Sequence, residues 1–173
     1  LFTQVLDQTV ADTTDETTLV GPGRGNAAVG ADLLTLGAAL RIRLRGHVST
    51  TGTPTLSVRL LLGGDEVCTT GAEALNADLD GAAFALDALI TCRSTGATGT
   101  VVASGLFEYD DGALLGMVKD TATTVDTTAA LPIAVTATWG AADEDNSITT
   151  QLMTIELLTP PDGLAPVAPS SLT

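Results

Sequence analysis

The amino-acid sequence predicts an all-β fold: an antiparallel β-sandwich, jelly-roll-like, with extended N- and C-terminal arms. Threonine supplies 29 of the 173 residues, and threonine and valine, both stiff about χ1, favour strands. Apolar residues recur at every second position through the long middle segments, as in half-buried strands. Turn signals rich in glycine, serine and proline separate these segments, as in sandwiches and barrels.

A chain of 173 residues is typical of one domain and is long enough to bury a core of its own. Aromatic residues make up only 3% of the chain, whereas apolar residues reach 45%. We therefore expect a core of leucine, valine, isoleucine and alanine.

The formal net charge is −14, from 21 acidic and seven basic residues. Nucleic-acid binding requires basic side chains that neutralise phosphates, and anionic membrane surfaces attract basic segments. We therefore expect no nucleic acid and no membrane among the partners. No apolar run approaches the roughly 20 residues of a membrane helix, and the absence of a charged segment ahead of an apolar stretch leads us to expect no signal peptide.

Residues 1–30 are polar and rich in turns, and they end in the glycine-rich stretch GPGRGN. We interpret them as an N-terminal arm that carries short strands, for instance Phe2–Leu6 and Thr17–Val20. Phe2 and Leu6 are apolar and would be stabilised by lying on another surface, so they are candidate contacts with a partner.

Residues 31–158 form the predicted sandwich domain, and its first long strand begins at Leu40. Apolar and basic residues alternate over residues 40–48, and the alternation resumes over residues 56–62 after a turn. Period two with one apolar face predicts a β-hairpin. In that hairpin Arg59 would face the arginines of the first strand.

Residues 84–92 and 101–109 repeat this layout around the turn STGATGT, so we interpret the two units as one hairpin used twice. Between them, residues 71–79 have the composition of one or two helical turns. Asp-Gly at positions 111–112 predicts a tight turn, because this pair supplies positive φ angles.

The last third contains three further predicted strands, at residues 123–127, 131–139 and 147–158. Four prolines follow between positions 160 and 169. Proline at this density gives an extended, semi-rigid segment. We therefore predict a C-terminal arm over residues 159–173.

Catalysis requires a nucleophile with a base, an acid–base pair or a metal. His47 is the only histidine, and no serine lies in a G-x-S-x-G motif. A pair of carboxylates like that of glycosidases stays open, but the aromatic residues that line sugar clefts are almost absent. We predict that the protein is not an enzyme and uses no cofactor.

Asp143 and Asp145 place oxygen ligands close together, as calcium requires. Their spacing is not that of an EF-hand loop, so a solvated hairpin loop is the favoured interpretation. Cys68 and Cys92 allow a disulfide between neighbouring strands. Cysteine is more often a small buried apolar residue, which is the interpretation we favour.

The most distinctive feature is a ladder of arginines, Arg41, Arg43 and Arg45, with Arg59 on the expected partner strand. Like charges side by side are unfavourable unless acidic residues pair with them. We favour pairing with acids on neighbouring strands of the same chain. The alternative is that the ladder pairs with an acidic surface of another subunit, and phosphate binding is a third reading.

Three stretches together resemble a diffuse group of tailed-bacteriophage virion proteins: LRIRLRGHVSTTGTPTLSVRLLLGG (40–64), ALITCRSTGATGTVVASGLFEY (88–109) and TTVDTTAALPIAVTATWGAADEDNSITTQLMTIELL (123–158). The resemblance covers roughly residues 11–158 and implies a β-sandwich virion component, trimeric, on the head or the tail. It carries no catalytic residues. It implies assembly in the host cytoplasm and partners that include the chain itself, the major capsid protein and other virion proteins.

The first functional hypothesis is therefore a non-enzymatic virion protein that decorates or stabilises the capsid. The alternative is a tail or head fibre domain that binds a host-surface receptor. A third hypothesis is a cell-surface or secreted adhesion module, which would favour a disulfide between Cys68 and Cys92.

Overall fold

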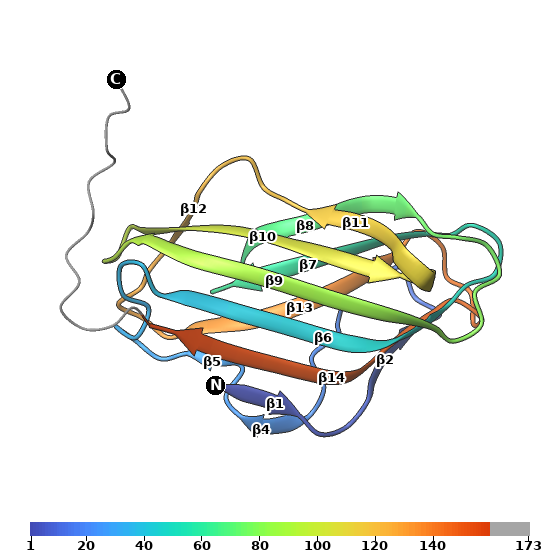
Figure 1. Cartoon of the computed structure of the whole chain (residues 1–173), viewed down its shortest axis with the longest axis horizontal. Coiled ribbons are helices and arrows are strands. Elements are labelled where there is room, and N and C mark those ends of the chain that lie inside the picture. The colour runs from blue at the N-terminus through green and yellow to red at the C-terminus, as the bar shows by residue number, and fades with distance from the viewer. Residues whose placement is uncertain (160–173) are drawn as a thin grey trace.

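The computed structural model describes residues 1–159. Two antiparallel sheets pack face to face (Figure 1), which confirms the all-β sandwich. Among the described residues the only helical element is the 3-10 turn η1 (Asp110–Gly112). The C-terminal arm predicted over residues 159–173 lies, apart from Thr159, outside the described residues.

The large sheet has nine strands. Seven follow one another across the sheet in the order β11 (Ala113–Met117), β10 (Gly99–Tyr109), β9 (Ala82–Ser94), β6 (Ala39–Ser49), β14 (Ser147–Leu158), β1 (Phe2–Gln4) and β4 (Gly23–Gly25). Two more pair beside this path, β12 (Thr123–Val125) with β10 and β2 (Gln8–Ala11) with β14.

The small sheet has five strands. Its order is β3 (Thr17–Thr18), β13 (Leu131–Trp139), β7 (Thr55–Leu62) and β8 (Asp65–Ala74), and β5 (Ala28–Val29) also pairs with β13. The strand order of the two sheets does not by itself confirm a jelly-roll connectivity, which stays a prediction.

The core lies between the sheets and is built by the period-two pattern. Alternate residues of β6 and β13 are buried, and their partners on the same strands face outward. Burying one such leucine, isoleucine or valine contributes about 1.5–3 kcal/mol. Phe84 and Phe107 stack with ring centroids 5.4 Å apart. The fully buried Trp139 donates from Nε1 to the Val10 carbonyl oxygen at 3.2 Å.

The first predicted hairpin is wrong, and the second is confirmed. Strand β6 pairs with β9 and β14, whereas β7 pairs with β13 and β8. Residues 50–54 therefore cross from one sheet to the other. Only β9 and β10 form the expected hairpin. Alternation shows that a strand has one buried face, and both sheets bury a face against the same core, so the pattern does not say which sheet a strand joins.

The predicted helical turns at residues 71–79 are also wrong. Strand β8 continues to Ala74, which lies opposite Thr55 of β7. It begins after a tight turn at Gly63 and Gly64, whose φ angles are +68° and +96°. Two successive positive φ angles are typical of a two-residue hairpin turn. Pairing with β7 thus overrides the helix-favouring composition of the segment.

Residues 1–30 do carry short strands, but they pack on the sandwich and do not project from it. Strands β1 and β2 pair with β14, and β3 and β5 pair with β13. The proposal that Phe2 contacts a partner is wrong, because its side chain is 8% exposed and lies over Gly23 of this same chain. Leu6 stays exposed.

Candidate interaction surface

The outer face of the large sheet exposes apolar side chains. We define this face as the side chains of β4, β6, β9, β10, β11 and β14, and of the adjoining Val118, that point away from the core. It accounts for six of the 11 exposed large hydrophobic residues among residues 1–159: Leu89, Leu106, Leu114, Val118, Leu152 and Leu158. Scattered exposed leucines are ordinary, but apolar side chains grouped on one face mark interaction sites. This face is therefore the first place to look for a partner's contact.

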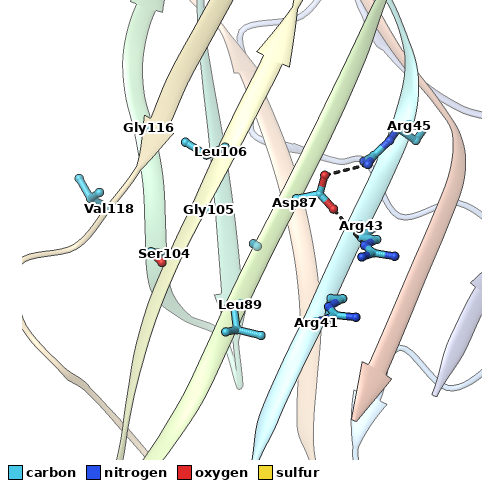
Figure 2. Close-up of a pocket in the computed structure, with 11 residues that line it drawn as sticks. Arg41, Arg43, Arg45, Asp87, Leu89, Ser104, Gly105, Leu106, Gly116 and Val118 are labelled. Carbon is cyan, nitrogen blue, oxygen red and sulfur yellow. Dashed lines mark hydrogen bonds and ion pairs between the residues drawn. The ribbon is translucent and has the colours of Figure 1, made fainter. Parts of the chain in front are cut away.

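A shallow hollow lies in this face, with a volume of about 660 Å³. Figure 2 shows Leu89, Leu106 and Val118 around it, with a row of arginines along one side. Ser104 and Gly116 are also in its lining, and a Cβ added at Gly116 would meet nothing within 4 Å. The small residues keep the hollow open, so a protruding apolar group of a partner has room to enter.

The arginine ladder is paired within the chain, as the favoured interpretation predicts. Arg43 Nε lies 3.1 Å from Asp87 Oδ1, and Arg45 Nη2 lies 2.7 Å from Asp87 Oδ2 (Figure 2). Arg41 Nη1 lies 3.8 Å from Glu156 Oε2. These arginine side chains are 42–49% exposed, and exposed pairs of this kind contribute no more than about 1 kcal/mol each. The guanidinium groups are therefore accessible to a partner.

Arg59 does not belong to this ladder, and its predicted place opposite the other arginines is wrong. It lies on β7 in the small sheet, because the chain crosses between the sheets after β6. Its Nε is 2.6 Å from Glu66 Oε2, and its Nη1 is 2.7 Å from Glu16 Oε2. The hydrogen bond that Arg59 donates to the Glu66 carboxylate, followed by the negative charge of Glu16, raises the pKa of Arg59.

Two further arginines share the outer face of the large sheet, and neither belongs to the ladder predicted from the sequence. Arg93 is exposed on β9 with the same parity as Leu89. Arg24 lies in the same cross-strand row as Arg43, because Thr3 and Thr154 pair between them in successive strands. The sequence alone could have placed Arg93 on the same face as Leu89, because the two residues share a parity on one strand. The position of Arg24 could not be predicted in this way, because it depends on the pairing of β1 with β4.

The outer face is thus basic on a protein that is otherwise strongly acidic. It holds five of the seven basic residues, Arg24, Arg41, Arg43, Arg45 and Arg93. It holds three acidic residues, Asp87, Glu108 and Glu156. Arginine beside apolar side chains is the composition that protein interfaces favour.

The two cysteines do not form a disulfide. Both are free and buried, Cys68 on β8 of the small sheet and Cys92 on β9 of the large sheet. Burial raises the pKa of the Cys68 thiol to about 12, and burial also raises the pKa of Cys92. Because the thiolate is the reactive form, neither cysteine is suited to nucleophilic chemistry.

The calcium candidates form a local turn. The Asp145 amide donates to Asp143 Oδ1 at 3.0 Å, which ties the two residues together within the loop. Over residues 1–159 no group of three or more histidine, cysteine, aspartate or glutamate side chains is arranged to hold a metal ion. His47 lies on β6 opposite Ala83 and Thr149, neither of which is a titratable partner. In this same part of the chain no helix has the length and apolar character needed to cross a membrane.

Comparison of the chain with protein-family models, with curated proteins and with solved structures finds no match. The chemistry of the outer face of the large sheet is therefore what indicates a function. That surface offers apolar side chains and accessible guanidinium groups, which suit the binding of another protein.

Proposed function

We propose that the protein is a non-enzymatic structural component of a tailed-bacteriophage virion. It decorates or stabilises the capsid through contacts with neighbouring subunits and other virion proteins. The observation that carries this proposal is the outer face of the large sheet, where exposed leucines and five arginines share one surface. The resemblance of three stretches of the sequence to virion proteins supports it independently.

The dimensions of the face suit a protein contact. The five strands β6, β9, β10, β11 and β14 are 5–13 residues long. At about 4.8 Å between strands and about 3.3 Å per residue, they span on the order of 800 Å². A stable interface of ordinary size buries about 800 Å² on each partner. The face alone therefore supplies most of one such contact.

The composition of the face fits a partner that is both acidic and apolar. Leu89 and Leu106 lie near its middle, and Arg41 and Arg43 lie beside them (Figure 2). Interface cores are apolar, and arginine binds carboxylates through two parallel hydrogen bonds. Aromatic residues, on which sugar rings stack, are absent from the residues that line the hollow.

In this proposal the partners are other copies of the chain, assembled as a homotrimer, and the major capsid protein or another virion protein. The protein lies on the capsid surface or the tail, after assembly in the host cytoplasm. A contact of modest affinity is sufficient there, because repetition across a shell multiplies the binding.

The test is the composition of purified virions from a host that produces this chain. We expect mass spectrometry to find its peptides in particles banded on a density gradient, and to lose them when Leu89→Asp and Leu106→Asp are combined. Leu36→Asp, an equal change at a leucine exposed outside this face, leaves the protein in the band. A wild-type chain that stays in the soluble fraction, away from particles, contradicts the proposed function.

A further inference from the structure

We propose that the outer face of the large sheet binds the acidic end of a second copy of this chain, in a head-to-tail contact. The acidic end is defined as the loops at residues 50–54, 75–81, 110–112 and 140–146. The inference rests on the proposed function only in using the same face as the contact surface. It adds which partner occupies the face and which part of that partner makes the contact.

The distribution of charge carries the inference. Outside the outer face, residues 1–159 include two basic residues, Arg59 and Lys119, against seventeen of the 20 acidic residues in this part of the chain. Arg59 is already paired with Glu16 and Glu66. Two copies that approach through other surfaces therefore bring acids against acids. The outer face is the surface on which a second copy meets opposite charge.

The four loops of the acidic end lie together at one end of the sandwich (the right-hand end of Figure 1). The Gly52 amide donates to Asp78 Oδ1 at 3.0 Å, and the Thr51 amide donates to Asn146 Oδ1 at 2.8 Å. These bonds join loops that are far apart in the sequence. The loops carry the acids Asp78, Asp80, Asp110, Asp143, Glu144 and Asp145, together with Asp111, and no lysine or arginine.

A head-to-tail contact is favoured over a face-to-face contact between two outer faces. Two outer faces can pack against each other around a two-fold axis so that each strand faces its own copy. In that arrangement the arginine-bearing strand β6 lies against β6 of the second copy. The like charges of Arg41 and Arg43 are then brought together, which is unfavourable. A head-to-tail contact places them against carboxylates, and it closes into a ring when the rotation between copies allows.

Four variants of the full chain test this arrangement by sedimentation velocity. The first reverses charge on the outer face, Arg41→Glu with Arg43→Glu. The second reverses charge on the acidic end, Asp80→Lys with Glu144→Lys; both residues are exposed, and neither side chain makes a hydrogen bond among the described residues. The third combines all four changes. The fourth, Lys119→Glu, is a control that reverses a charge outside both surfaces.

We expect the wild-type chain to associate in about 0.1 M salt and to dissociate in about 1 M salt, where the screening length falls from about 10 Å to about 3 Å. Each double reversal weakens association by about tenfold or more, and the combined variant recovers most of it. The two double reversals change the net charge in opposite directions, so general repulsion between copies predicts opposite effects and does not explain two losses. Lys119→Glu associates as the wild-type does.

Circular dichroism of each variant shows whether it is folded, so that a loss of association is not a loss of structure. A combined variant that fails to recover while folded overturns the head-to-tail contact. A loss with the face reversal but not with the end reversal also overturns it, and indicates a contact between outer faces. A wild-type chain that is monomeric at every salt concentration overturns the inference but leaves the proposed function to the virion test. Association by a chain that is absent from virions overturns only the proposed function.

Discussion

Replacing Gln4 by leucine is expected to destabilise the whole sandwich, because this side chain fastens the N-terminal segment to its body. Gln4 is 3% exposed. Its Nε2 donates to the carbonyl oxygens of Thr150 at 2.9 Å and Leu6 at 2.8 Å, and its Oε1 accepts from the Gly21 amide at 3.0 Å. One amide thus joins β1, the bulge in β14 and the approach to β4.

The magnitude follows from the groups that lose their partners. Leucine is apolar and cannot form hydrogen bonds, so the Gly21 amide and the Thr150 carbonyl are left without this partner. A buried polar group without a partner costs about 1–3 kcal/mol. Burial of the apolar leucine side chain offsets part of this loss. We expect a net decrease of about 2–3 kcal/mol in the free energy of unfolding.

Urea unfolding followed by the fluorescence of Trp139, the single tryptophan of the chain, measures this decrease. Gln151→Leu is the matched control, since Gln151 is exposed at the same bulge of β14, and it leaves the midpoint almost unchanged. Equal midpoints for the Gln4 variant and the wild-type chain would refute the reasoning. The N-terminal segment would then contribute little to the stability of the sandwich.

Three further predictions concern single positions. In Gly46→Ala the new Cβ overlaps the carbonyl oxygen of Thr149 on the neighbouring strand, so we expect a large drop in the midpoint of thermal unfolding. Gly116→Ala is the control: its Cβ meets open space, and we expect no such drop. Burial raises the pKa of Cys68 from 9.0 to about 12, so the folded state favours the neutral thiol. The stability that this thiol contributes is fully present below about pH 9 and is lost as the pH rises toward about 12. The Cys68→Ala variant therefore loses less stability than the wild-type chain over this pH range. Arg59→Ala removes two ion pairs and lowers the free energy of unfolding by no more than about 2 kcal/mol, with a smaller effect in about 1 M salt.

The long strands were predictable because their pattern is local. Apolar residues on one parity are enough to place β6, β7, β9, β10, β13 and β14 within a few residues of their observed bounds. Strand β8 was missed, since its end carries alanine and glutamate, which favour helices. Its structure is decided by pairing with β7, a contact that the segment's own sequence does not reveal.

The candidate surface was predictable only in part, because it depends on which strands are neighbours. The parity of Arg41, Arg43 and Arg45 placed these residues on one face correctly. Arg59 was misplaced because the five-residue connection at residues 50–54 can either reverse the chain within one sheet or carry it the roughly 10 Å to the other sheet. Leu106 and the other outward leucines form a group only once β9, β10 and β11 lie side by side.

The most direct test of the central claim is hydroxyl-radical footprinting of the wild-type chain, associated in about 0.1 M salt and dissociated in about 1 M salt. We predict that Leu89, Leu106 and Val118 on the outer face lose reactivity on association, while Leu33 and Leu36, exposed elsewhere, stay reactive. Unchanged reactivity of the outer-face residues in the associated protein would contradict the claim that this protein binds its neighbours through the outer face of its large sheet.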